Sequence, residues 1–310
     1  MSVARKRRAS TGGPSAKAVD ADGDKQLESS WFHLPSLRRW SEVPPWQQAN
    51  PYILSGYRTG YTTWQCLVSI FAIHNETGNI WTHLVGIPVF LYFTYLTYAK
   101  VVLEPIISHH AIFLPFVLAN VAVMVFSTAF HTLAGHMSGR VYDIALKCDV
   151  LGVAILIVTC FFPPIYFGFS CIPFWRDVYI TSIILLGSTG IIAPFVDAQN
   201  KYHHLKVALY IVIVVSGLLP TFHWALAFPR SQATVPPLAG IALMFLQYGI
   251  AVLCYLARVP ERWFPGHFDY WLTSHQIWHI GVFCAMVTHV FTCWTVYARF
   301  ESLKGETAAC

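Results

Sequence analysis

The sequence predicts an all-α membrane protein with seven transmembrane helices, an N-terminus in the cytosol and an extracellular or lumenal C-terminus. Of its 310 residues, 55% are hydrophobic and only 11% are charged, whereas a soluble domain carries about 25% charged residues. Seven apolar segments are long enough to cross the hydrocarbon core of a bilayer, which needs about 20 helical residues. Lysine and arginine are distributed unevenly between the two sides of these segments, and this asymmetry gives the orientation.

The chain before the first span divides into two parts. Residues 1–48 form a basic tail that we expect to be cytosolic and disordered, because Ser, Gly, Ala and charged residues dominate positions 1–30. Residues 49–78 form a juxtamembrane segment. Within it, four apolar residues recur at helical spacing: Trp64, Leu67, Ile70 and Phe71. They predict a short amphipathic helix on the inner membrane surface, and the alternative is an extension of the first span.

The transmembrane domain is predicted over residues 79–298, followed by a short outer tail, 299–310. The expected spans are 79–99, 110–133, 145–168, 178–198, 205–228, 237–257 and 272–298. The eight cysteines form neither a CxxC pair nor a zinc-finger spacing. Most of them lie in apolar segments, where a cysteine is usually a small buried hydrophobic residue rather than part of a disulfide framework.

The loops between the spans set the orientation. Residues 1–58 hold nine of the twenty Lys and Arg residues, and each short loop on that side carries two, against one in each opposite loop. By the positive-inside rule the N-terminus is cytosolic. This orientation is the reverse of a G-protein-coupled receptor and argues against that class. It also keeps the sequon at Asn75 in the cytosol, where we expect it to stay unmodified.

Four ionisable side chains from three spans are expected at one depth near the inner leaflet. His131 ends the second span, Asp149 lies about one turn into the third, and His275 and His279 lie in the first two turns of the seventh. Histidines four residues apart share one face of a helix, and an isolated carboxylate inside a membrane is costly unless it has a partner. Together these side chains predict a metal site with imidazole and carboxylate ligands, which suits zinc with an open coordination position.

Each of these residues also has a simpler structural interpretation. A single histidine in a span is more often packed and hydrogen-bonded than a metal ligand, and Lys147 offers Asp149 a plain salt bridge. Ser127, one turn before His131 on the same face, is either a partner of a ligand or of the metal's water, or a serine bonded to its own backbone. Three further histidines in the spans show no comparable grouping: His83, His223 and His289.

Several motifs around these residues resemble the progestin and adipoQ receptor family, which includes the adiponectin receptors. The matching stretches are NETGNIWTHL (75–84), STAFH (127–131), the segment through Asp149, RVPERWFPG (258–266) and SHQIWH (274–279), and the resemblance covers about residues 40–298. It implies seven helices with a cytosolic N-terminus. It also implies a zinc ion held by three histidines, which correspond to His131, His275 and His279.

The resemblance extends to neighbouring residues and to the compartment. Asp149 corresponds to the family's aspartate, which holds the water of the zinc site, and Ser127 corresponds to a serine beside the ligands. The gap from His131 to Asp149 is one residue longer than we expect for adiponectin receptors. This gap, PTFHW (220–224) and SHQIWH (274–279) look more like the Golgi-resident subtype, so we expect the Golgi or the plasma membrane.

Two functions are compatible with these expectations. The first is a zinc-dependent hydrolase of a ceramide-like membrane lipid, in which Asp149 orients a water and acts as general base; the resemblance supplies the substrate class. The second is a non-catalytic signalling receptor or Golgi membrane tether with structural zinc, an extracellular ligand and a cytosolic signalling partner. We expect no nucleic-acid partner. A transporter fits less well, because the polar residues cluster at one face of the membrane instead of along a path across it.

Overall fold

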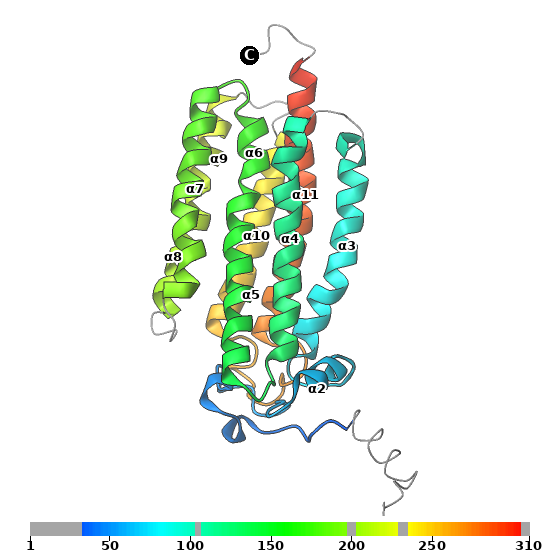
Figure 1. Cartoon of the computed structure of the whole chain (residues 1–310). Coiled ribbons are helices and arrows are strands. Elements are labelled where there is room, and N and C mark those ends of the chain that lie inside the picture. Colours follow the sequence, from blue (N-terminus) through cyan, green and yellow to red (C-terminus); the bar gives the residue numbers. More distant parts are fainter. Residues whose placement is uncertain (1–32, 103–106, 197–202, 229–234, 305–310) are drawn as a thin grey trace, which may run out of the picture.

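The computed structural model describes residues 33–102, 107–196, 203–228 and 235–304. The stretch 1–30, predicted to be disordered, and residues 305–310 of the predicted outer tail lie outside these ranges. Within the described ranges, seven helical stretches are long and apolar enough to span a membrane, and only two isolated β-bridges occur besides helices and turns. The chain is therefore an all-α, multi-pass integral membrane protein, as the sequence predicts (Figure 1).

Each predicted span coincides with a helix or a pair of helices. The elements are α3 (Thr77–Val102), α4 (Ile107–Leu133), α5 (Gly139–Cys160) with α6 (Phe162–Gly168), α7 (Pro173–Val196), α8 (His203–Ser216) with α9 (Leu218–Ala227), α10 (Val235–Ala257) and α11 (Ser274–Lys304). Three details differ from the prediction. The third span begins earlier, at Gly139, the third and fifth spans are each divided into two helices, and α11 continues past residue 298 into the predicted outer tail.

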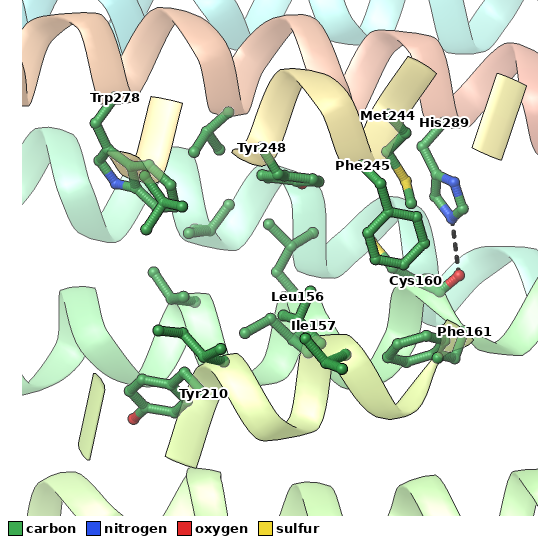
Figure 2. A pocket seen from close by; sticks show the side chains of 18 of the residues that line it. Leu156, Ile157, Cys160, Phe161, Tyr210, Met244, Phe245, Tyr248, Trp278 and His289 are labelled. Carbon is green, nitrogen blue, oxygen red and sulfur yellow. Dashed lines mark hydrogen bonds between the residues drawn. The ribbon is translucent and has the colours of Figure 1, made fainter. Parts of the chain in front are cut away.

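The division between α5 and α6 follows from proline. Pro164 has no N–H and cannot bond the carbonyl of Cys160 four residues earlier, so this carbonyl needs another donor. His289 of α11 supplies it, because its Nε2 lies 2.8 Å from the Cys160 oxygen (Figure 2). Gly217, between α8 and α9, faces the same break, and a Cβ added there would collide with the Phe161 ring. His289 thus joins α11 to the break in the third span.

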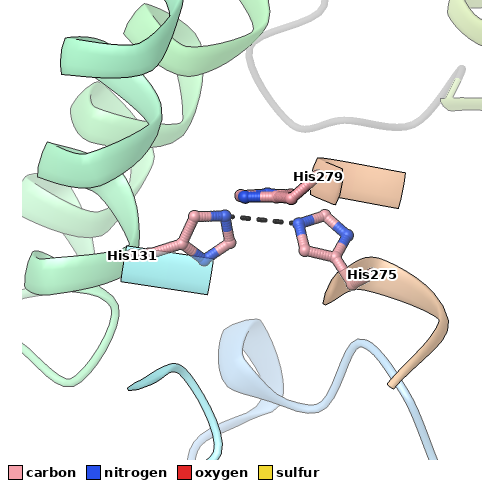
Figure 3. Close-up of side chains that lie close together, drawn as sticks. All are labelled: His131, His275 and His279. Atoms are coloured by element: carbon pink, nitrogen blue, oxygen red, sulfur yellow. Dashed lines mark hydrogen bonds between the residues drawn. The ribbon is translucent and has the colours of Figure 1, made fainter. Parts of the chain in front are cut away.

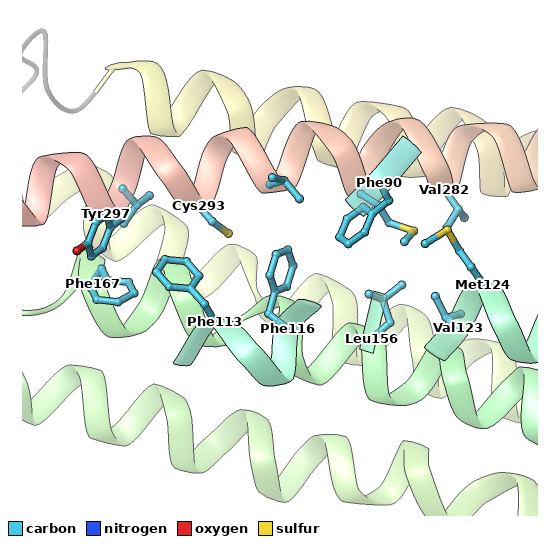
Figure 4. Packing of buried hydrophobic residues seen from close by; sticks show 13 residues of the cluster. Phe90, Phe113, Phe116, Val123, Met124, Leu156, Phe167, Val282, Cys293 and Tyr297 are labelled. Carbon is cyan, nitrogen blue, oxygen red and sulfur yellow. The ribbon is translucent and has the colours of Figure 1, made fainter. Parts of the chain in front are cut away.

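Helix α11 packs against α10, α3 and α6 and supplies a large part of the apolar core. Figure 4 shows its buried side chains meeting those of α3, α4, α5 and α6. The fully buried members of this cluster include Phe90, Phe116, Met124, Phe167, Met286, Val290 and Cys293. This packing fixes the position of the first turns of α11, where His275 and His279 lie.

The segment before α3 is folded from residue 33 onwards. It contains the short 3-10 helices η1 (Trp40–Glu42) and η2 (Pro45–Gln47), and Val43, Ile53 and Tyr57 form a small buried cluster. The prediction of a disordered tail up to residue 48 is therefore wrong for residues 33–48. The segment lies across one end of the bundle, beside the start of α3 and the end of α4 (Figure 1).

Residues 63–73, where the sequence predicts an amphipathic helix, contain α2 (Thr63–Val68) and η3 (Ser69–Phe71). Thr62 begins α2 with a capping box, because its hydroxyl accepts from the Gln65 N–H while the Gln65 side chain accepts from the Thr62 N–H. The large apolar side chains of Trp64, Leu67 and Phe71 are exposed on this element. The small side chains of Cys66 and Ser69 are buried beneath it. An exposed apolar face at the height where the spans begin is typical of contact with the membrane interface.

Candidate metal centre

Three histidines meet at the end of the bundle that carries the N-terminal segment (Figure 3). His131 comes from the last turn of α4, and His275 and His279 come from the first turns of α11. One ring nitrogen from each lies within 4.8 Å of the other two, and Nε2 of His131 is 3.2 Å from Nε2 of His275. His131 and His279 are buried and His275 is partly buried. The structure therefore brings three of the four predicted ligands together.

The other ring nitrogens of two of these histidines are held by neighbouring side chains. Nδ1 of His131 lies 2.8 Å from Oε2 of Glu76. Because an ionised carboxylate only accepts, Nδ1 carries the proton and Nε2 presents its lone pair to the cluster. Nδ1 of His279 lies 3.3 Å from Oγ1 of Thr82. This is the arrangement of metal-ligating histidines with fixed rings, and the triad could hold a metal ion.

Glu76 is a site residue that the sequence patterns did not identify. It immediately precedes α3 and also accepts a hydrogen bond of 2.6 Å from Nδ2 of Asn79. Burial raises the pKa of its carboxyl, but the hydrogen bonds from His131 and Asn79 and the electrostatic interactions with the rings of His131 and His275 outweigh this effect and hold the pKa well below the usual range of glutamate. The sequence feature that could have identified Glu76 is its position in the polar stretch at the start of the first span, at the same membrane depth as the triad.

Asp149 and Ser127 lie beside the triad but outside it. Both line the same cavity, and the Ser127 hydroxyl is within hydrogen-bonding reach of the Asp149 carboxylate. Among the described residues, the cluster of mutually close donor atoms does not include Asp149. Lys147, the rival partner of Asp149, instead pairs with Asp143 at 2.7 Å. The site therefore consists of three clustered imidazoles and two carboxylates outside the cluster, Glu76 bonded to His131 and Asp149 on the cavity wall.

Arg58 closes the end of α4 next to His131. Its side chain is buried, and its guanidinium donates to the carbonyl oxygens of His131 at 2.6 Å and Thr132 at 3.0 Å, and to the Ser69 hydroxyl at 2.6 Å. The last carbonyls of a helix have no donor within the helix, and a positive charge there also interacts favourably with the helix dipole. Arg58 thus holds the backbone of a triad residue from the N-terminal segment.

Two more residues of this segment cap the chain just beyond α4. The side chain of Gln47 donates to the Ala134 carbonyl at 2.5 Å, and the Tyr61 N–H donates to the Gly135 carbonyl at 3.0 Å. Gly135 must be a glycine, because a Cβ there would lie 2.6 Å from the Cβ of Arg58. The N-terminal segment is therefore part of the support of the site.

Replacing Arg58 with methionine is expected to lower the free energy of unfolding by roughly 2–4 kcal/mol, because buried acceptors lose their donor. Thermal unfolding of the detergent-solubilised protein measures this effect as a drop in Tm of several degrees. Arg262→Met removes an exposed arginine at the same end of the bundle and serves as the control. Equal melting temperatures for the two variants would show that the cap does not stabilise α4.

His83 lies much closer to the triad than the sequence indicated. Its ring stacks on that of His279, with centroids 4.0 Å apart and an interplanar angle of 15°. The conclusion that His83 belongs to no group was therefore wrong. The sequence places His83 about one turn into the first span but does not show which way that face of the helix turns.

A cavity of about 550 Å³ leads from the triad into the bundle. Its polar lining includes His83, Ser127, Asp149, His275 and His279, together with the charged side chains of Asp143, Lys147 and Lys206. Further along, the side chains are almost all apolar, and Figure 2 shows Leu156, Phe161, Phe245 and Tyr248 among them. Ligand pockets commonly have volumes of about 300–1,000 Å³. A polar end joined to an apolar interior suits a molecule with one polar group and a long hydrocarbon chain.

The sequence matches one protein family and is similar to several proteins that are named as receptors. Residues 71–290 match the family described as Haemolysin-III related. The "Adiponectin receptor protein" of Drosophila melanogaster is 34% identical over 271 residues, which cover 86% of this chain and 60% of the relative. The "Progestin and adipoQ receptor-like protein 1" of Caenorhabditis elegans is 31% identical over 273 residues, covering 86% and 61%.

The "Progestin and adipoQ receptor family member 3" of Homo sapiens is 30% identical over 261 residues, covering 79% of this chain and 80% of the relative. The chain thus spans about 60% of the length of the fly and nematode proteins and a larger share of the human one. The match to the family includes all three histidines of the triad. The chain belongs to the haemolysin-III related family of membrane proteins, together with these adiponectin receptor and progestin and adipoQ receptor relatives.

Proposed function

We propose that this protein is a zinc-dependent hydrolase that cleaves the amide bond of a ceramide-like membrane lipid. The observation that carries the proposal is the position of Asp149, which lies beside a cluster of three histidines but not within it, at the polar end of an apolar cavity. A catalytic zinc site keeps three protein ligands and one open position, whereas a structural site is closed by four. Three ligands and a free carboxylate favour the catalytic type.

The triad fits zinc in its donor atoms and in its supports. Neutral imidazoles are common zinc ligands, and a carboxylate behind one of them, as Glu76 lies behind His131, is typical of zinc sites. His131, His275 and His279 would hold the ion. When bound, zinc would polarise the amide carbonyl and make water more acidic.

The residues around the triad would supply proton transfer and positioning. Asp149 would take a proton from the attacking water as the new bond between oxygen and the carbonyl carbon forms, and pass it to the nitrogen as the carbon–nitrogen bond breaks. Ser127, within reach of Asp149, would orient the carboxylate. The products are a fatty acid and a sphingoid base. The apolar cavity would hold the hydrocarbon of a lipid that enters sideways from the leaflet and would exclude bulk water.

The test is ceramide turnover by the purified full chain in lipid nanodiscs. Mass spectrometry measures the release of sphingoid base and fatty acid in equal amounts. We expect release from zinc-loaded protein, loss after treatment with a chelator, and recovery when zinc is returned. A zinc-loaded, folded protein that releases neither product would overturn the hydrolase.

Replacing Glu76 with glutamine is expected to weaken zinc binding by roughly tenfold to a hundredfold, because partners of metal-ligating histidines contribute about this much to metal affinity. The amide can still bond His131 but carries no charge. Competition with a chelator of known affinity measures the change. Glu42→Gln alters an exposed glutamate of the N-terminal segment and is expected to leave the affinity as it is. Matching affinities for the two variants would remove Glu76 from the site.

A signalling receptor with structural zinc is the second candidate, favoured by the receptor names of the relatives and by the contacts of the N-terminal segment with α4. In that case an extracellular ligand and a cytosolic partner would act on opposite ends of the bundle, at the plasma membrane or in the Golgi. A cytosolic protein that displaced Arg58 would release the end of α4 that carries His131. Stoichiometric zinc without lipid turnover would favour this candidate over the hydrolase.

A further inference from the structure

His83 is a buried histidine without a hydrogen-bond partner among the described residues. Its side chain is only 4% exposed, and neither ring nitrogen bonds any group in the part of the chain that the structure describes. A neutral imidazole carries one donor and one acceptor, and burying both without partners is unfavourable. No such partner lies among the described residues, so both ring nitrogens are open to a molecule that binds beside the ring.

The surroundings of His83 show where this partner would lie. The ring lines the cavity at its polar end, together with Ser127 and Asp149, and its stacking on His279 fixes the ring plane. The other described histidines of the cavity wall each have at least one nitrogen engaged: His275 with His131, His279 with Thr82, and His289 with Cys160. His83 is thus available to a molecule that occupies the cavity.

We infer that His83 donates a hydrogen bond to the carbonyl oxygen of the lipid amide. This inference rests on the proposed hydrolase and adds a substrate-binding residue to it. The carbonyl oxygen is the strongest neutral acceptor of an amide, and it becomes negative when the carbon is attacked, so a fixed donor stabilises it more in the transition state than in the bound substrate. His83 would hold this oxygen while Asp149 moves the proton.

The test compares two replacements of His83 in the zinc-loaded full chain. His83→Phe keeps a flat ring that can stack on His279 but cannot form a hydrogen bond, whereas His83→Gln restores a donor without the ring. Zinc per chain is measured first and is expected to equal that of the wild type in both. Turnover of ceramide is expected to fall about 10²- to 10³-fold in His83→Phe, chiefly in kcat, and to recover in part in His83→Gln.

A binding measurement separates the role of His83 from turnover. It uses two uncleavable ceramide analogues, one with a ketone in place of the amide and one with methylene groups there. His83→Phe is expected to weaken binding of the ketone by about tenfold, the loss of one buried hydrogen bond, and to leave binding of the methylene analogue unchanged. His83→Leu provides a second apolar replacement if the phenylalanine variant fails to fold, and the same difference is expected.

The binding and turnover results test the hydrogen bond of His83 and the hydrolase activity separately. Equal loss of affinity for both analogues, or no loss for either, would overturn the hydrogen bond to the carbonyl. A ketone affinity that depends on His83 in a wild type that hydrolyses no ceramide would overturn the hydrolase and leave the binding role of His83 in place.

Discussion

Replacing Asp149 with asparagine is expected to abolish hydrolysis of the lipid amide while the zinc content of the protein stays unchanged. Asp149 lies outside the cluster of three histidines, so its loss leaves the ligands in place. An asparagine fits the same space and can still bond Ser127, but it cannot accept a proton. Loss of a general base typically lowers the rate by about 10²- to 10⁴-fold.

The measurement pairs ceramide turnover with zinc per chain on the same preparation. Asp177→Asn changes an exposed aspartate on α7, beside Arg176, and is expected to retain turnover. Full activity of a zinc-loaded Asp149→Asn protein would remove Asp149 from the mechanism. Loss of zinc together with activity would make Asp149 a direct ligand and favour a closed, structural site.

Replacing His279 with alanine is expected to remove zinc altogether. The variant leaves two imidazoles, and it opens a space beside His83, whose ring has lost its stacking partner. Metal affinity depends steeply on the number of ligands, and zinc that binds only the folded state adds to stability. We therefore expect a zinc-free protein with a lower melting temperature, which no longer rises when zinc is added.

The control for this variant is His267→Ala, which removes an exposed histidine of the loop between α10 and α11. It is expected to keep both zinc and the response of the melting temperature to zinc. A His279→Ala protein that binds zinc as tightly as the wild type would show that the triad is not the metal site.

The fold and the triad were predictable because both follow from patterns along the chain. The lengths of the apolar runs give the seven spans, since a bilayer of fixed thickness requires a fixed length of helix. Once the spans alternate in direction, His131 at the end of one and His275 and His279 at the start of another must lie at the same depth. The structure adds that α4 and α11 also face each other there.

The contacts that support the triad were not predictable in this way. Glu76 and His131 are 55 residues apart, and Arg58 and His131 are 73 apart. Their pairing depends on how the N-terminal segment folds over the end of the bundle, which no local pattern determines. The prediction that His83 does not group with the other histidines was wrong for a related reason. The sequence gives the depth of a residue in a span but not the rotation of its helix about the axis. The same limit applies to Asp149, whose position just outside the triad only the packed helices define.

The most direct test of the zinc site is the amount of zinc bound per chain, measured by elemental mass spectrometry on the purified, folded wild-type protein. We predict about one zinc ion per chain, held by His131, His275 and His279. A folded wild-type chain that contains no zinc, and takes up none when it is supplied, would contradict this prediction. The three histidines would then be packing groups. Both the proposed hydrolase and the proposed zinc-stabilised receptor would be excluded.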